Sequence, residues 1–290
     1  MSADPPGLPP LREVIAEHGL GADKRFGQHY LLDLNVTAKI ARLCGDLSVA
    51  SAIEIGPGPG GLTRGLLAEG AGKVVAIERD ERFIAALGSL DAAYPERLTL
   101  VHADALGADE PALAHAAGAP GPYVIASNLP YNVGTALLIK WLQAEPPWWS
   151  RAVLMFQKEV AQRVTAGPGE SAYGRLAVIA QARCTTRLAF TLPARAFTPP
   201  PKVDSAVVVL DPLAAEDRFD DVAALETVTA SAFGQRRKTL RRSLAQAASR
   251  TGKNAESLLE TAGIDPGARA ETVPVERFIA LAKAWREARG

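Results

Sequence analysis

Residues 127–132 read SNLPYN and follow the apolar run YVIA, which is typical of a buried strand. The segment offers two hydrogen-bond acceptors, the side-chain oxygen of Asn128 and the backbone carbonyl of Leu129, beside the ring of Tyr131. Pro130 fixes the turn between them. Two acceptors next to an aromatic face suit a planar heterocycle with an exocyclic amino group, so the segment is a candidate site for chemistry on such an amine.

An amino group on a heteroaromatic ring is a weak nucleophile because its lone pair is delocalised into the ring. Acceptors on both of its N–H bonds would pull the nitrogen toward sp³ geometry and free the lone pair for in-line attack on a methyl group. Such catalysis depends on orientation and electrostatics, and needs no strong base. The alternative is a rigid turn with a buried tyrosine, and that alternative is preferred unless a cofactor site lies upstream.

A cofactor site is indicated by glycines and acids at the ends of the earlier expected strands. Gly56, Gly58 and Gly61 in EIGPGPGG form a G-x-G-x-x-G turn between a strand and a helix, which is a weak signal by itself. Glu78 ends the next strand, 22 residues after Gly56, where a carboxylate can accept both ribose hydroxyls. Asp104 follows the third strand and can accept from an adenine amino group. Each acid alone is more often a helix cap, but three aligned features favour an adenosine-containing cofactor.

The type of cofactor is indicated by two prolines in the glycine-rich turn. Pro57 and Pro59 remove two backbone N–H donors, which makes the turn a poor cradle for phosphate. A dinucleotide would need such a cradle, whereas S-adenosylmethionine carries no phosphate. The turn therefore favours S-adenosylmethionine as the cofactor.

The elements that must position these residues alternate between strands and helices in the first part of the chain. Near-continuous apolar strands separated by helices predict a Rossmann-like, doubly wound α/β fold with a parallel sheet covered on both faces. The expected strands lie near residues 50–56, 72–80, 97–106, 122–130 and 151–157, with two further strand-like pieces at 173–193 and 205–212. An acidic, proline-containing linker follows, and beyond it the pattern is helical. We predict a cofactor-binding domain over residues 1–212, with a flexible start at 1–20, and a smaller all-helical domain over 213–290.

Composition excludes several classes of protein. The 290 residues are 48% hydrophobic and 22% charged, which is ordinary for a globular protein, and no apolar stretch approaches the length of a membrane span. Cys44 and Cys184 are too few for a disulfide framework and are expected to be buried thiols of a cytoplasmic protein. The four histidines show no ligand spacing, so no metal site is expected. Nothing in the sequence indicates more than a monomer.

The charge pattern is uneven although the formal net charge is zero. Residues 231–253 carry seven Lys or Arg and no acidic residue. Such a segment indicates contact with a polyanion. The alternative is a solvated helix face balanced by acids from elsewhere in the fold, and this pattern alone does not decide between the two.

Taken together, these motifs resemble the ribosomal RNA adenine N6,N6-dimethyltransferases, which use S-adenosylmethionine. The resemblance covers residues 20–280, and its combination of motifs is highly specific. It is carried by EIGPGPGGLT and NLPY, and by KRFGQHYLLDLNV (24–36), MFQKEVAQRV (155–164), YGRLAV (173–178), FTPPPKVDSAVV (197–208) and AFGQRRKTLRRSL (232–244). The segments at 24–36 and 232–244 favour the bacterial small-subunit (16S) branch, whose substrate is rRNA of the immature 30S subunit.

The resemblance implies roles for individual residues. The implied cofactor-binding residues are His29, where the family usually has Asn, with Leu31, Gly56, Gly58, Glu78, Asp104 and Asn128. Asn128, Leu129 and Pro130 are implied to handle the target amine, with the flipped adenine stacked on Tyr131 and closed on its other side by Phe197. The implied RNA-binding residues are Arg236, Arg237, Lys238, Arg241 and Arg242, flanking Leu240 and Leu244, whose spacing packs one helix face inward.

Other functions remain open at this point. One relative methylates an adenine of large-subunit (23S) rRNA and confers antibiotic resistance, and another is a mitochondrial transcription factor, which the absence of a transit-like start argues against. A non-catalytic RNA-binding assembly factor is a different class, which the intact 128–131 motif argues against. A nicotinamide oxidoreductase has odds below about one in twenty, because the chain lacks a candidate hydride-site His or Tyr-x-x-x-Lys pair.

Overall fold

The computed structural model describes residues 7–21 and 28–289. It divides into two compact units, the first formed by Met1–Ala161 and Leu188–Asp211 and the second by Gln162–Arg187 and Pro212–Gly290. Residues 162–187 therefore group with the C-terminal helices, whereas the predicted single boundary after residue 212 assigns them to the first domain. The reason is local packing, since helix α9 (Arg175–Gln181) packs on helices α10 (Val222–Gly234) and α14 (Val275–Glu287).

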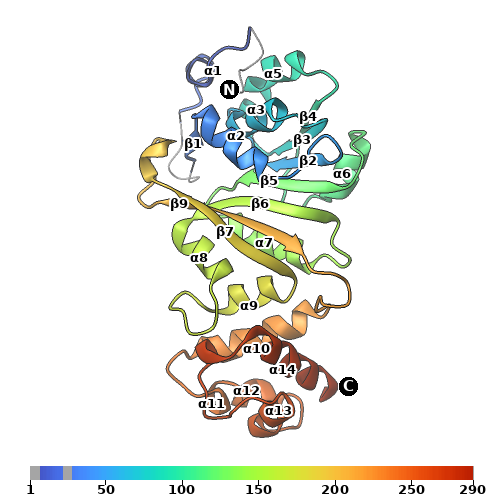
Figure 1. Ribbon diagram of the computed structural model, residues 1–290, viewed down its shortest axis with the longest axis vertical. Coiled ribbons are helices and arrows are strands. Elements are labelled where there is room, and N and C mark those ends of the chain that lie inside the picture. Colours follow the sequence, from blue (N-terminus) through green and yellow to red (C-terminus); the bar gives the residue numbers. More distant parts are fainter. Residues whose placement is uncertain (1–6, 22–27, 290) are drawn as a thin grey trace. The chain divides into compact units, whose positions relative to one another are not determined.

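The first unit is built on a mixed sheet (Figure 1). The order of its strands is β4 (Leu98–His102), β3 (Lys73–Glu78), β2 (Ser51–Ile55), β5 (Tyr123–Asn128), β6 (Trp149–Gln157), β9 (Ser205–Pro212) and β7 (Cys184–Leu192). The first five strands pair in parallel, which confirms the predicted doubly wound sheet, and β9 is antiparallel to β6. The strand order reverses between β2 and β5, so a crevice is expected at their carboxyl ends.

Helices follow the strands as the sequence predicts. The helices of this part of the chain are α1 (Leu11–Glu17), α2 (Leu34–Arg42), α3 (Gly61–Ala68), α4 (Glu81–Ala86), α5 (Gly88–Ala93), α6 (Glu110–Ala116), α7 (Gly134–Gln143) and α8 (Lys158–Thr165). A two-residue strand, β1 (Tyr30–Leu31), pairs with β8 (Phe197–Thr198) apart from the main sheet. Three of these helices are capped by the aspartate that directly precedes them. The side chains of Asp33, Asp80 and Asp109 accept from backbone N–H groups in the first turns of α2, α4 and α6.

Two predictions about this part of the chain were wrong. Residues 173–193 were predicted to be strand, but Arg175–Gln181 is helix α9 and only Cys184–Leu192 is a strand, because a short apolar run has the same periodicity in either buried state. The start of the chain was predicted to be flexible, yet Leu11 and Val14 are buried on helix α1. Residues 1–6 of that start, and residues 24–27 of the resembling segment, lie outside the described residues.

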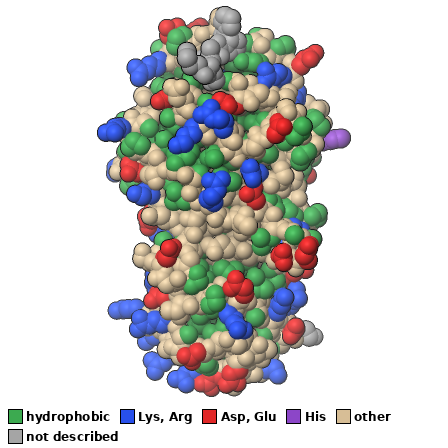
Figure 2. All heavy atoms as spheres, viewed as in Figure 1, with side chains coloured by type: hydrophobic (Ala, Val, Ile, Leu, Met, Phe, Trp, Pro, Cys, Tyr) green, Lys and Arg blue, Asp and Glu red, His purple; other side chains and the backbone are tan. Residues whose placement is uncertain are grey.

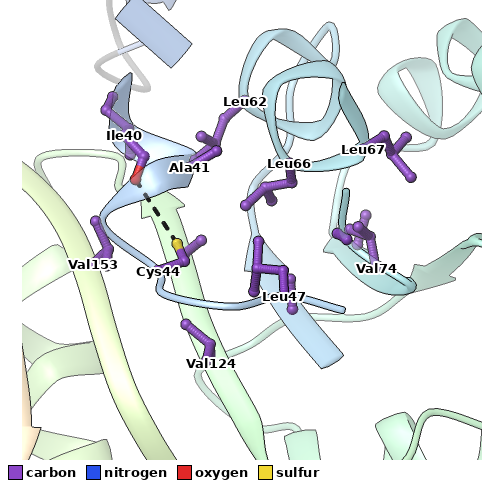
Figure 3. Close-up of a cluster of buried hydrophobic side chains, with 14 of the residues drawn as sticks. Ile40, Ala41, Cys44, Leu47, Leu62, Leu66, Leu67, Val74, Val124 and Val153 are labelled. Carbon is purple, nitrogen blue, oxygen red and sulfur yellow. Dashed lines mark hydrogen bonds between the residues drawn. The ribbon is translucent and has the colours of Figure 1, made fainter. Parts of the chain in front are cut away.

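The core of the first unit lies where α2 and α3 meet the strands (Figure 3). Figure 3 shows Leu62 and Leu66 of α3 near Ile40 and Ala41 of α2, with strand valines on the other side. Cys44 is buried among them, its Sγ lies 3.9 Å from the Ile40 carbonyl, and burial raises its pKa to about 12. Cys44 is therefore an unreactive core thiol, as the sequence predicted.

The second unit packs α9 and α14 against α10, with the short helices α11 (Leu240–Ser243), α12 (Ala245–Ser249) and α13 (Ala255–Thr261) alongside. Phe233 stacks on Phe278 with ring centroids 5.4 Å apart. Leu240 and Leu244 are buried as predicted, but residues 235–239 form turns and bends between α10 and α11 in place of a continuous basic helix. None of the helices in the described residues is long and apolar enough to cross a membrane.

Candidate active site

A cleft of about 510 Å³ lies in the first unit at the carboxyl ends of β2, β3 and β5. This is the place where the strand order reverses and where ligands of open α/β sheets bind. The predicted site residues that line it are His29, Leu31, Gly56, Gly58, Glu78, Asp104, Asn128, Leu129, Pro130 and Tyr131. The structure thus brings the predicted cofactor residues and the NLPY segment to one cleft.

The glycine-rich turn shapes the floor of the cleft. Gly56 and Gly58 have φ angles of +66° and +54°, a region that residues with a Cβ rarely adopt. Gly61 begins α3 so close to the Leu31 carbonyl oxygen that a Cβ at this position would collide with it. Glycine is therefore required here for close packing of the turn against β1, which places Leu31 at the cleft.

The carboxylate of Glu78 is held in a fixed orientation. Its Oε1 accepts from the backbone N–H groups of Arg79 at 2.8 Å and Asp80 at 2.9 Å, and its Oε2 lies 3.4 Å from the Gly58 nitrogen. Burial raises the pKa of Glu78, and the backbone donors oppose that rise. A pre-oriented acceptor at the end of β3 is what recognition of a ribose diol requires.

Glu54 is a second acid at the cleft, and the sequence analysis did not single it out. It is 1% exposed, and its Oε2 has no hydrogen-bond partner among the described residues. Burial raises its pKa to about 8, and the nearby charge of Glu78 adds to the rise. Glu54 is part of the EIGPGPGG segment, but its burial depends on contacts with distant parts of the chain, which could not be predicted from the sequence.

Asp104 lies at the outer edge of the cleft on the loop after β4. Its Oδ1 accepts from the Leu106 N–H at 3.0 Å, and its Oδ2 lies 3.5 Å from Arg79. Leu106 lines the cleft and is 43% exposed, which is unusual for a large apolar side chain beside a carboxylate. The pair can place an acceptor and an apolar surface against one planar ring.

The NLPY segment is held by contacts to His29, which directly precedes β1, and to Ser205 of β9. The Asn128 side-chain nitrogen donates to the His29 carbonyl at 3.1 Å, so the oxygen end of the amide is directed to other partners. The Tyr131 hydroxyl is 2.7 Å from Ser205 Oγ, and burial raises the pKa of the phenol. These contacts fix both an acceptor and an aromatic face at the cleft.

His29 takes a structural position that the sequence analysis did not foresee. Its Nδ1 donates to the Pro199 carbonyl at 2.8 Å, and its ring lies 5.5 Å from the Tyr131 ring at an angle of 33°. The imidazole therefore joins the residue before β1 to the loop after β8 and packs near the Tyr131 ring.

Phe197 does not line the cleft. It is 3% exposed, belongs to the hydrophobic core, and pairs with Leu31 through the backbone of β8 and β1. It is absent from the residues that line the cleft, so this geometry does not support the prediction that it closes the far side of the target base. A phenylalanine at the start of a strand is compatible either with stacking on a target base or with burial in the core, and in this structure Phe197 is buried in the core.

The five predicted RNA-binding residues of the second unit fall into two groups. Arg236 pairs with Glu271 at 3.1 Å and donates to the Ser171 carbonyl, and Arg241 pairs with Glu256 at 2.9 Å. The remaining three, called here the exposed basic trio, have no ion pair within the part of the chain that the structure describes. The trio consists of Arg237, Lys238 and Arg242, all exposed. The view in Figure 2 shows Lys and Arg side chains along one edge of the C-terminal part of the chain.

Among residues 7–21 and 28–289, no group of three or more His, Cys, Asp or Glu side chains could hold a metal ion. The cleft fits a cationic adenosine cofactor better than a pyrophosphate. Glu78 lies beside its turn, and its two arginines, Arg79 and Arg82, are next to Asp104 and Asp80.

Comparison with known proteins identifies the family. The sequence model described as "Ribosomal RNA adenine dimethylase" matches residues 20–287. The chain belongs to this family. It is 66% identical to the ribosomal RNA small subunit methyltransferase A of Maricaulis maris over 97% of this chain and 96% of that protein. The protein of the same name from Mesorhizobium japonicum is 56% identical over 97% and 99% of the two chains.

Two solved structures of ribosomal or adenosine methyltransferases resemble this member of the dimethylase family. A dimethyladenosine transferase from Plasmodium falciparum is 25% identical, with a TM-score of 0.74 and coverage of 90% of this chain and 98% of that one. The 23S rRNA methyltransferase ErmE is 26% identical, with a TM-score of 0.64 and coverage of 89% and 99%. The family model and the relatives named small subunit methyltransferase A confirm the family predicted from the motifs, including its bacterial small-subunit branch.

Proposed function

We propose that this protein is an S-adenosylmethionine-dependent adenine N6,N6-dimethyltransferase of small-subunit (16S) rRNA, acting on two adjacent adenines of the immature 30S subunit in the cytoplasm. One observation carries the proposal. The cleft places Glu78 and Asp104, suited to an adenosine, beside Asn128 and Tyr131, suited to a second adenine. Relatives named small subunit methyltransferase A, 54–66% identical over nearly the whole chain, support the choice of substrate.

The cofactor site is assigned to the residues of the first unit. The fixed carboxylate of Glu78 would accept from the ribose hydroxyls, Asp104 from the adenine amino group, and the Leu31 and Gly56 backbone would lie along the methionine part. The carboxylate of Glu78 beside the turn, whose Oε2 lies 3.4 Å from the Gly58 nitrogen, suits a cation. Bound S-adenosylmethionine would supply an electrophilic methyl group on its sulfonium.

The residues of the NLPY segment would orient the target amine. The Asn128 side-chain oxygen and the Leu129 carbonyl would accept its two N–H bonds, and the base would stack on Tyr131 after leaving its helix. These acceptors would hold the nitrogen with its lone pair toward the methyl group that bound S-adenosylmethionine would supply, with S-adenosylhomocysteine as the leaving group and the amine proton released to solvent. Catalysis is thus assigned to orientation and to fixed acceptors.

RNA binding is assigned to the second unit. The exposed basic trio carries no ion pair in the described residues, so its charges are available to phosphates, whereas Arg236 and Arg241 are engaged by glutamates. Phosphate contacts position RNA without reading its sequence. Of the five basic residues named from the sequence, we therefore assign the main phosphate contacts to the trio and a supporting role to the other two.

The test of this proposal is methyl transfer to two substrates side by side. Purified protein is incubated with radiolabelled S-adenosylmethionine and either small subunits that lack adenine dimethylation or unmethylated large-subunit RNA. Label in the small subunit alone supports the proposal. Label in the large-subunit RNA would move the protein to the antibiotic-resistance type, and cofactor binding without label in either would favour a non-catalytic assembly factor.

A further inference from the structure

A half-buried ion pair outside the predicted site joins the two sides of the cleft. Lys140 of α7 places its Nζ 2.9 and 2.8 Å from the two carboxylate oxygens of Glu110, which is 1% exposed at the start of α6. The same Nζ donates to the carbonyls of Ala105 at 2.7 Å and Ala108 at 2.5 Å. One ammonium group therefore binds a carboxylate and two backbone oxygens of one loop.

That loop carries the adenosine side of the cleft. It begins at Asp104, whose carbonyl accepts from the N–H groups of Gly107 and Ala108 at 3.1 and 3.0 Å in a tight turn. Ala105 and Leu106 line the cleft. The Lys140 bonds to the Ala105 and Ala108 carbonyls therefore hold the turn that carries Asp104 and Leu106.

The helix that carries Lys140 belongs to the other side of the cleft. Helix α7 begins at Gly134, directly after the NLPY loop, and the Gly134 N–H donates to the Pro130 carbonyl at 3.0 Å. Leu137, one turn before Lys140, also lines the cleft. Lys140 thus connects the loop of Asp104 to the helix that follows Asn128 and Tyr131.

The carboxylate of Glu110 also accepts a hydrogen bond from a residue other than Lys140. Trp141 donates from Nε1 to the Glu110 Oε1 at 3.0 Å, and its side chain is 1% exposed. A compact ammonium with three donors can serve acceptors in several directions, which an uncharged side chain of the same length cannot do. Removing Lys140 alone would leave a buried carboxylate without its cation, so a single substitution would mix a stability effect with a positioning effect.

We propose that Lys140 is a positioning residue for cofactor recognition: it holds the loop of Asp104 at a set distance from the NLPY helix and thereby sets the affinity for the adenosine part of the cofactor. This inference rests on the proposed function, because it takes the cleft as the cofactor site. The residue touches neither cofactor nor target base, and it acts through Asp104 and Leu106.

The experiment compares three variants with the wild-type full-length protein. Lys140→Met/Glu110→Gln removes both charges, which keeps the buried site neutral while deleting the bonds to the loop. Lys140→Arg restores a cation. Lys73→Met is the matched control, because Lys73 in the same unit donates to the Glu96 carbonyl, away from the cleft. For each we measure S-adenosylmethionine affinity by calorimetry, KM and kcat for methyl transfer, and the thermal midpoint.

The double variant is expected to bind the cofactor about tenfold more weakly, the equivalent of one charged hydrogen bond, with kcat at saturating cofactor within about twofold of wild type. Lys140→Arg should regain part of the affinity, and Lys73→Met should match wild type. Wild-type affinity in the folded double variant would overturn the inference. So would a parallel loss of kcat, affinity and thermal midpoint, which would show a general structural role. If the wild type itself fails to bind the cofactor, the proposed function fails and not this inference alone.

Discussion

Replacing Asn128 by Ala separates the chemical role of this side chain from its structural role. The structure shows one hydrogen bond to lose, from the side-chain nitrogen to the His29 carbonyl at 3.1 Å in a partly buried position. Such a bond contributes about 1 kcal/mol, which corresponds to a fall of about 2–4 °C in the thermal midpoint of a protein of this size. Loss of a fixed acceptor for the reacting amine should lower kcat by about 10²–10³-fold.

The assay is single-turnover methyl transfer to small subunits, with thermal melting and RNA binding measured on the same samples. Asn35→Ala is the matched control, because Asn35 is exposed on α2 and does not line the cleft. The account expects a large loss of rate with nearly unchanged RNA affinity and a small fall in the midpoint. It would be refuted by a variant with wild-type rate, or by one whose rate loss is matched by unfolding.

Other perturbations test separate parts of the site. Tyr131→Phe keeps the ring and loses only the Ser205 contact, so the rate of methyl transfer should stay within about tenfold of wild type. Tyr131→Ala should also lose the stacking of the target base, which contributes about 1–3 kcal/mol. Equal rates for the two variants would argue against stacking. Changing the exposed basic trio to glutamine should reduce the slope of log affinity against log salt by about two to three, whereas changing the two paired arginines should reduce it less, as measured by filter binding from 50 to 200 mM salt. Burial raises the pKa of Glu54 in the folded protein to about 8 from its ordinary 4.5, so the cofactor-free protein should lose stability as the pH rises between these values. In Glu54→Gln the thermal midpoint should not show this fall with pH. Identical pH profiles of the thermal midpoint for the variant and the wild type would contradict the assigned burial.

The sequence predicted the parts of the site that depend on local patterns. The glycine turn, Glu78 and Asp104 each follow a strand that alternation with helices makes recognisable, and parallel strands bring their carboxyl ends to one edge. The motif at Asn128 to Tyr131 was visible for the same reason. These features were predictable because they follow directly from the order of strands along the chain.

The features that sequence reasoning missed depend on partners far away in the chain. The pairing of Arg236 with Glu271 and of Arg241 with Glu256 removes two charges from a segment that looks uniformly basic. The burial of Phe197 depends on the pairing of β8 with β1, and the raised pKa of Glu54 depends on its burial and on the nearby charge of Glu78. Helix α9 was read as strand because its apolar run is too short for periodicity to decide.

The measurement that tests the central claim most directly is the identity of the product. Small subunits that lack adenine dimethylation are treated with the protein and S-adenosylmethionine, the RNA is digested to nucleosides, and the products are separated by mass. The account predicts N6,N6-dimethyladenosine from the small-subunit RNA with the wild type, and none with Asn128→Ala. A methyl group on another atom or another nucleoside, or an unchanged yield with Asn128→Ala, would contradict the claim that this cleft methylates an adenine amine through the NLPY segment.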